Sequence, residues 1–332
     1  MKKLTMTKKR NLFITLLILP AGTGILLMAM ILGQVNIAPS SIVEALFHGT
    51  PETVSIILYK LRIPRILMAL IIGASLGASG VLYQALLKNP LAEPFTLGIS
   101  SGAACGAAFA IIMSLSTGFI FAGAFAGSIF VIILVYLLAR KFGFSSPALI
   151  LGGLSLSFIF SSAVLLLFAF SSADQVHKAL MWLMGDLSLA RYDYLGRSAM
   201  ALGALLIVTL LYSRHLNILS FGDDFAASHG ITRSEILIIF WVASMLAAIS
   251  VSLAGVIGFI GLITPHAVRV LSGPEHRVLL PVTAVTGGLL LVMADTMGRT
   301  IVSPYEIPAG IIMGFFGGIF FLVILLKRGW SG

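Results

Sequence analysis

Apolar runs separated by short polar breaks dominate this chain. A membrane-spanning helix needs about 20 predominantly apolar residues, and ten runs approach or reach that length. They cover residues 12–32, 63–86, 97–114, 118–139, 148–171, 195–213, 236–253, 255–267, 278–299 and 308–326. Ser116, Thr117 and Gly118 predict a turn between the third and fourth runs. The pattern therefore predicts an all-α integral membrane protein built as a bundle of ten transmembrane helices.

Composition supports this class. Hydrophobic residues make up 59% of the 332 residues and charged residues 10%, against roughly 25% charged in a soluble domain. Mean hydropathy is +1.09. These values exclude an ordinary soluble enzyme, a disordered chain and a disulfide scaffold. The longest polar breaks, 33–61, 172–194 and 214–235, are too short to build a second core, so we predict one transmembrane domain over 1–332.

The basic residues predict the orientation. Five of them precede the first run, which is longer than the core of a secretory signal: Lys2, Lys3, Lys8, Lys9 and Arg10. With ten spans, 14 of the 21 Lys and Arg fall on the N-terminal side and seven on the other. The positive-inside rule then places both termini in the cytoplasm. Because the charges are dispersed among the breaks, topology explains the net charge of +9 better than nucleic-acid binding does.

Few residues offer chemistry inside the spans. Cys105 is the sole cysteine, so no internal disulfide forms. Glycines recur three or four residues apart, as at Gly102 and Gly106, which favours close packing of helices. Asp295 is the main ionisable group deep in a run, and we expect it to pair with Arg299 one turn away rather than to relay protons. The chain lacks a phosphate-binding loop of the G-x-x-x-x-G-K-[ST] type, so its coupling energy should enter from a partner.

An ordered series of motifs accompanies these runs. It comprises Leu61-Arg62-Ile63-Pro64-Arg65, the glycines at 73, 77 and 80, Gln84, Asn89-Pro90-Leu91-Ala92-Glu93-Pro94, Gly258-Phe259-Ile260-Gly261, Pro265-His266, Arg269, His276-Arg277, Asp295, Arg299 and Glu306-x-Pro308-x-Gly310. From about residue 60 to 326 the series resembles the FecCD family, the permease subunits of ABC importers for iron chelates and cobalamin. The resemblance implies a fold of the type II importer permease kind, with the N- and C-termini inside.

The resemblance also implies partners. A homodimer would form the pathway along its axis, two copies of an ATP-binding subunit would attach in the cytoplasm, and one extracytoplasmic substrate-binding protein would dock outside. Arg62, Arg65 and Arg299 match the family arginines that face acidic residues of the binding protein. Arginine suits this role because its fork makes two charge-assisted hydrogen bonds to a carboxylate. Anchoring of helix ends at lipid headgroups is the alternative for the same residues.

The cytoplasmic break 214–235 resembles the region that couples the family's permeases to the ATPase. Its matching residues are Gly222, Asp223, Ala226, Ala227 and Gly230. The family usually has Leu-Gly-Glu where this chain has Phe221-Gly222-Asp223, and an apolar residue where His229 stands. A lone loop histidine is more often solvated than functional.

Two further assignments follow from the resemblance. The residues matching the cytoplasmic gate are Asn89, Leu91, Ser145 and Ser146, although Asn89 before a proline also serves simply to end a helix. The last span has Gly317-Gly318 in place of the family's Gly-Ala-Pro, which supplies flexibility without a kink. His266 and His276 do not have metal-ligand spacing.

We therefore expect a multi-pass permease in the cytoplasmic membrane of a bacterium or archaeon. Its cargo would be a metal chelate, first a ferric siderophore, with cobalamin or haem as alternatives. We expect no catalytic residue, cofactor or resident metal, and lipid as its surroundings. An ion-coupled secondary carrier would need intramembrane carboxylates, and a membrane-embedded enzyme would need clustered Asp, His or Ser.

Overall fold

The structure is a computed structural model that describes residues 18–47, 52–142 and 145–328. The five basic residues near the N-terminus, from Lys2 to Arg10, lie outside this part, as does the start of the first apolar run. Within it, each of the ten predicted runs carries an apolar helix. Six of these helices are long and apolar enough to cross a membrane and four are shorter, which confirms the all-α membrane fold. The cytoplasmic location of the termini stays a prediction from the charge count.

The helices follow one another through short connections. The first apolar helix covers Ile18–Ile31, and the outer segment that follows holds α2 (Pro39–Phe47), α3 (Glu52–Ser55) and the π-helix η1 (Ile56–Arg62). The first half of the bundle then contains α4 (Ile63–Leu87), the 3₁₀-helix η2 (Pro94–Leu97), α5 (Ile99–Ile112), α6 (Thr117–Lys141), α7 (Ser146–Ala169) and α8 (Ala173–Leu183). The second half contains α9 (Tyr192–Leu211), α10 (Ser213–Leu219), α11 (Asp223–Ser228), α12 (Arg233–Ala254), α13 (Ile260–Ser272), α14 (His276–Thr300) and α15 (Ala309–Arg328).

Two helices begin well away from their predicted starts. The segment 52–62, predicted to belong to a polar break, is helical and continues into α4 as one helix over Thr53–Leu87. The run predicted to span 255–267 begins its helix only at Ile260, because Gly255 and Phe259 adopt positive φ angles of 70° and 68°. The break 255–259 is apolar, and its backbone conformation depends on packing that hydropathy does not report.

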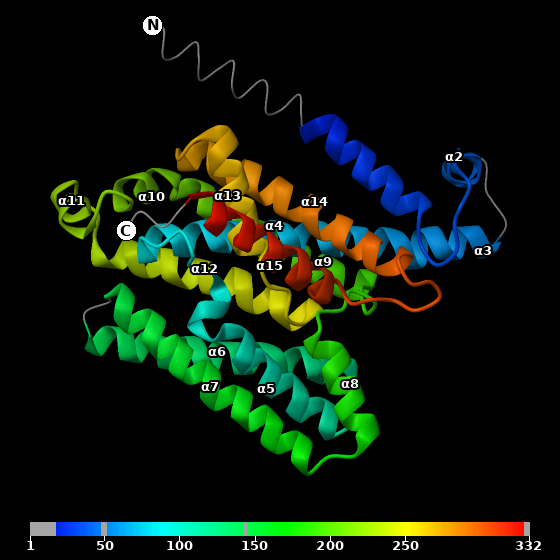
Figure 1. The fold of residues 1–332 in the computed structure, drawn as a ribbon, viewed down its shortest axis with the longest axis horizontal. Helices are drawn as coiled ribbons and strands as arrows, with labels where there is room; N and C mark the ends of the chain where they lie inside the picture. Colours follow the sequence, from blue (N-terminus) through cyan, green and yellow to red (C-terminus); the bar gives the residue numbers. More distant parts are fainter. Residues whose placement is uncertain (1–17, 48–51, 143–144, 329–332) are drawn as a thin grey trace, which may run out of the picture.

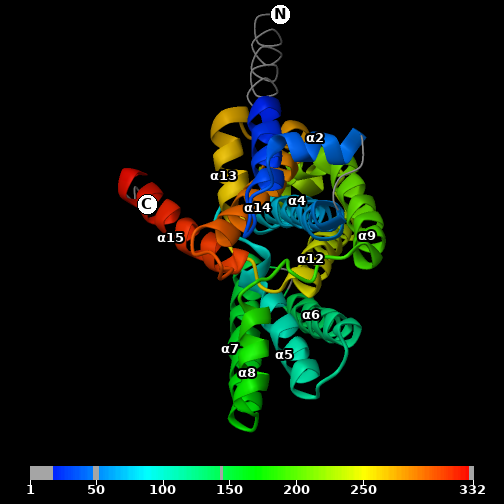
Figure 2. The same cartoon turned by 90° about the vertical axis from the view of Figure 1, so that its right-hand side faces the viewer.

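The helices form two packed groups. Figure 2 shows α5, α6, α7 and α8 below the group that contains α4, α9, α12, α13 and α14, whereas α15 projects to one side. In Figure 1, α4 and α14 run side by side through the upper group. A buried apolar cluster joins the two groups. Its residues come from helices that include α4, α5, α6, α12 and α14, and Tyr83 and Phe240 are among its largest side chains.

Glycines allow the closest helix contacts, as the spacing predicts. A Cβ atom at Gly80 of α4 would lie 2.0 Å from the carbonyl oxygen of Gly261 in α13. A Cβ at Gly106 of α5 would lie equally close, 2.0 Å, to that of Gly123 in α6. Only glycine permits backbones to approach so closely, and in a membrane such packing drives helix association.

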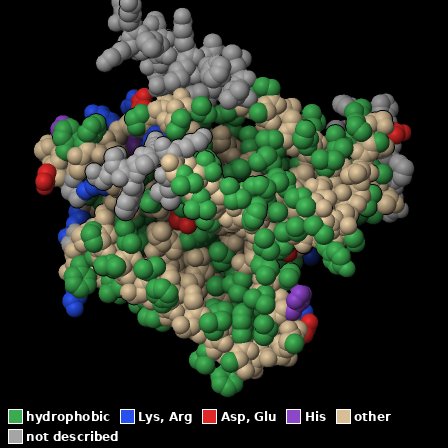
Figure 3. All heavy atoms as spheres, in the orientation of Figure 1, with side chains coloured by type: hydrophobic (Ala, Val, Ile, Leu, Met, Phe, Trp, Pro, Cys, Tyr) green, Lys and Arg blue, Asp and Glu red, His purple; other side chains and the backbone are tan. Residues whose placement is uncertain are grey.

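The surface agrees with a membrane location. Figure 3 shows hydrophobic side chains across the middle of this face, with Lys and Arg gathered at the end where α10 and α11 lie. Large exposed apolar residues such as Leu151, Phe158 and Leu165 lie along α7. The protein is thus a multi-pass membrane protein.

Candidate functional site

Five charged side chains converge at the outer end of the bundle. Arg62 ends η1, Arg65 lies in the first turn of α4, Asp295 and Arg299 lie in the last turns of α14, and Glu306 belongs to the linker before α15. Residues more than 200 positions apart thereby form one cluster, because α4 and α14 pack side by side (Figure 1). We call these five residues the outer cluster.

Arg65 is the centre of the outer cluster. Its Nε donates to both carboxylate oxygens of Asp295 at 2.9 and 3.1 Å, and its Nη2 lies 2.8 Å from Asp295 Oδ1. Its Nη1 donates to Glu306 Oε2 at 2.8 Å. Arg299 Nε donates to Asp295 Oδ2 at 3.1 Å. The expected pairing of Asp295 with Arg299 is confirmed, whereas nothing in the sequence indicates its second partner, Arg65.

Arg62 makes no carboxylate contact among these residues. Its guanidinium donates to the carbonyl oxygens of Met30, Ile31 and Val35, at 3.0 Å for Ile31, at the end of the first helix and in the loop that follows it. Arg62 and Arg299 are each 4% exposed, and the Arg65 side chain is 12% exposed. The docking role predicted for the three arginines stays a prediction, and in this structure their contacts lie within the chain.

The predicted coupling residues lie on and around two short helices at the opposite end. Gly222, with a φ of 118°, separates α10 from α11, and Gly230, with a φ of 82°, precedes α12. Asp223 begins α11, and Ala226 is 1% exposed and joins the main core. Ala227 on the same helix is exposed. Gly222 and Gly230 therefore form backbone turns, Ala226 is a buried anchor and Ala227 belongs to an exposed face.

Aromatic side chains cover that exposed face. Phe221 is 74% and Phe225 41% exposed. The ring of His229 stacks on Phe225 with centroids 4.0 Å apart, and its Nδ1 lies 2.9 Å from the Phe225 carbonyl oxygen. His229, which we expected to be solvated, is exposed but is also ordered by this stacking. Exposed apolar rings at the polar end of a membrane protein are typical of a protein interface.

The predicted gate residues belong to the turn after α4 and to the start of α7. Asn89 follows α4, and its Oδ1 accepts the backbone N–H of Leu91 at 2.9 Å. Leu91 is exposed, and Ser145 and Ser146 lie at the start of α7. The turn ends α4, and its gating role stays a prediction.

A polar cavity of about 470 Å³ lies between the end of α4 and the start of α14, and Asn89 lines it. Arg269 Nη2 donates to Gln84 Oε1 at 2.9 Å, and His276 Nδ1 lies 2.8 Å from Asn217 Oδ1. These contacts connect α13 to α4 and α14 to α10. The sequence does not predict these contacts, although Gln84 belongs to the motif series described above.

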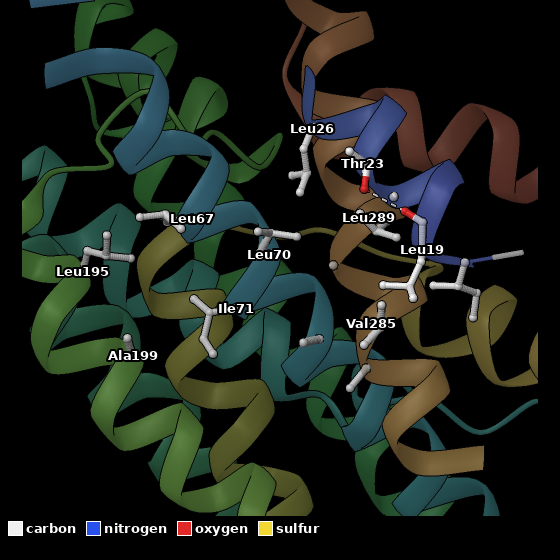
Figure 4. Close-up of a pocket in the computed structure, with 15 residues that line it drawn as sticks. Leu19, Thr23, Leu26, Leu67, Leu70, Ile71, Leu195, Ala199, Val285 and Leu289 are labelled. Atoms are coloured by element: carbon white, nitrogen blue, oxygen red, sulfur yellow. Dashed lines mark hydrogen bonds between the residues drawn. The ribbon is translucent and has the colours of Figure 1, made fainter. Parts of the chain in front are cut away.

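An apolar groove of about 600 Å³ lies between the first helix, α4, α9 and α14 (Figure 4). Leu19, Leu67, Leu70 and Leu289 lie along it. The hydroxyl of Thr23, a polar residue of the lining, donates to the Leu19 carbonyl oxygen at 2.8 Å. The groove offers almost no polar partner to a charged cargo, so we do not regard it as the transport pathway.

Comparison with known proteins gives a consistent result. The chain matches the FecCD transport family over residues 17–327. It is similar to the cobalamin import system permease protein of Halobacterium salinarum, with 40% identity over 84% of this chain and 76% of that protein. It is also similar to the hemin transport system permease protein of Yersinia pestis, with 35% identity over 92% of this chain and 94% of that protein.

A solved structure agrees with both. An ABC transporter assigned to the metal-chelate type, captured in an inward-facing conformation, superposes with a TM-score of 0.85 at 30% identity and covers 96% of this chain and 99% of its own. The family match, the two relatives and the solved structure each cover at least 84% of the chain. The chain belongs to the FecCD transport family and is a permease of the cytoplasmic membrane.

Proposed function

We propose that this chain is the membrane subunit of an ATP-driven importer that moves a metal chelate into the cytoplasm, with a ferric siderophore as the first candidate cargo. The relatives named above carry cobalamin and hemin, and the similar structure is of the metal-chelate type. Haem and cobalamin are therefore the alternatives. A ferric siderophore comes first because iron chelates are the commonest cargo in the family.

The distribution of buried charge is the observation that carries the proposal. Among the described residues, the buried charged or histidine side chains are Arg62, Asp295, Arg299 and His276. The first three belong to the outer cluster, and His276 begins α14 at the opposite end. An ion-coupled carrier uses ionisable groups near the midplane, so this arrangement favours energy supplied by a partner.

Glu93 also bears on an ion-coupled mechanism, because its carboxylate is not fully exposed. It lies in the connection between α4 and η2, is half-buried, and its carboxylate is close enough to the backbone N–H of Phe259, in the break before α13, to be stabilised by it. A carboxylate beside a backbone N–H at the start of a helix is typical of capping. We therefore assign Glu93 a structural role.

We assign a partner to each end of the helix bundle and a second copy of this chain to one of its sides. The exposed rings of Phe221, Phe225 and His229 suit an apolar groove of a cytoplasmic ATP-binding subunit, two copies of which would serve a homodimer. The face of α15, where Gly314 and Gly318 meet nothing within 4 Å, suits a second copy of this chain. The outer cluster suits acidic residues of an extracytoplasmic binding protein. The ATP hydrolysis then belongs to the partner.

Uptake measurements with a panel of cargoes test the proposal. The permease, reconstituted in liposomes with the ATP-binding subunit and the binding protein encoded with it, is supplied with a ferric siderophore, hemin or cobalamin. ATP-dependent uptake of the siderophore alone is the expected result. Uptake of hemin or cobalamin alone would replace the cargo assignment, and ATP turnover without uptake of any of the three would contradict all three assignments.

A further inference from the structure

A small cavity opens beside the outer cluster. It has a volume of about 290 Å³ and is lined by Arg62, Arg65, Arg299 and Glu306, together with the loop at 33–35 and residues near Ser188. A cavity of this size accommodates a side chain rather than a chelate. Three guanidiniums in its wall specify a carboxylate as its occupant.

The charge of the outer cluster is unbalanced. Three guanidiniums face two carboxylates, and Arg62 donates only to backbone carbonyl oxygens among the contacts described above. The cluster therefore has a surplus of one positive charge and attracts a further carboxylate.

The two carboxylates already present differ in how firmly they are held. Asp295 is 2% exposed, belongs to α14 and contacts two arginines. The Glu306 side chain is 30% exposed, belongs to the linker 301–308 and contacts Arg65 through one of its oxygens. Glu306 is therefore the carboxylate that an incoming one can replace.

We propose that docking of the extracytoplasmic binding protein replaces Glu306 on Arg65. Before docking, the Glu306 carboxylate binds Arg65; after docking, a carboxylate of the binding protein takes its position. This inference rests on the proposed docking of that protein at the outer cluster. The exchange conserves the charge around Arg65 and frees Glu306 together with its linker.

Release of the linker also affects how the start of α15 is held. Ile307 donates its backbone N–H to Gly298 at 2.9 Å, and Gly310, in the first turn of α15, donates to Gly185 at 3.4 Å. A Cβ at Gly310 would lie 2.3 Å from the Met184 carbonyl oxygen, so the start of α15 is tightly seated. Freeing Glu306 removes the side-chain anchor next to this seat, and docking outside thereby loosens the helix that we assign to the dimer.

Binding measurements on Glu306→Gln test the exchange. The full chain in lipid nanodiscs, wild type or variant, is titrated with the binding protein encoded with it, and Kd is measured by biolayer interferometry. Because the amide no longer competes as an anion for Arg65, Kd should fall about threefold to tenfold. Asp193→Asn is the matched control, since it also removes one acidic partner of an arginine at the outer end, where both side chains are more than 70% exposed. Its Kd should stay within about twofold.

Hydrogen–deuterium exchange of the unmodified protein provides a second readout. Binding should increase exchange of the amides at 305–310, because the linker loses its anchor. An unchanged or higher Kd for Glu306→Gln, or amides at 305–310 that become more protected on binding, would overturn the exchange. Absence of any binding to the wild-type chain would instead overturn the proposed docking itself.

Discussion

Replacing Asp295 by Asn tests whether the outer cluster is a buried ion-pair network. Asp295 is 2% exposed and lies 2.8 Å from Arg65 and 3.1 Å from Arg299. The amide keeps one oxygen acceptor but directs its NH₂ group at guanidiniums that can only donate. Removal of one partner of a buried pair costs about 3–5 kcal/mol. Because one acceptor survives, we expect the free energy of unfolding to fall by about 3 kcal/mol.

The assay is denaturant titration of the purified protein in mixed micelles, followed by circular dichroism. Asp174→Asn is the matched control, because Asp174 pairs with Lys178 at the same i,i+4 spacing but with side chains 71% and 65% exposed. An exposed pair of this kind contributes about 0.3–0.5 kcal/mol. Equal losses in the two variants would show that water solvates Arg65 and Arg299, and would refute the burial on which the outer cluster depends.

Three further predictions address packing, energy source and coupling. Gly80→Ala should lower the free energy of unfolding by about 1–3 kcal/mol, because its Cβ would meet the Gly261 carbonyl oxygen at 2.0 Å. Gly203→Ala is the control, because a Cβ there meets nothing within 4 Å, and it should not lower stability. Equal stabilities of the two variants in thermal unfolding would contradict the close helix contact. Glu93→Gln should keep ATP-dependent uptake within about twofold, because an amide oxygen still caps the helix start; loss of uptake in an otherwise folded variant would favour an ion-coupled carrier. Phe225→Ala should lower ATP turnover of the assembled importer about threefold or more by removing an exposed aromatic anchor, with binding of the extracytoplasmic protein unchanged; wild-type turnover would contradict coupling at α11.

The sequence predicts the helices better than their joints. Apolar runs locate the ten apolar helices of the described residues because lipid imposes length and composition on each one. The break at 255–259 is missed because Gly255 and Phe259 are as apolar as the spans around them, and their positive φ angles arise from packing. The helix over 56–62 is missed because Lys60 and Arg62 look like a polar loop, although the backbone continues into α4.

The outer cluster is predictable only in part. Asp295 and Arg299 are four residues apart on one helix, so their contact follows from helical geometry. Arg65 and Glu306 are separated by 241 positions, and nothing local indicates that α4 and the linker before α15 meet. The carbonyl contacts of Arg62 are equally inaccessible, because they depend on where the loop after the first helix closes.

The source of energy is the central claim, and uptake by proteoliposomes tests it most directly. Vesicles containing the permease are prepared with and without its ATP-binding subunit and supplied with the binding protein and radiolabelled ferric siderophore. In each, internal ATP is compared with an imposed proton or sodium gradient. We predict uptake only where the ATP-binding subunit and ATP are both present. Uptake driven by a gradient in vesicles that lack the subunit would contradict the account.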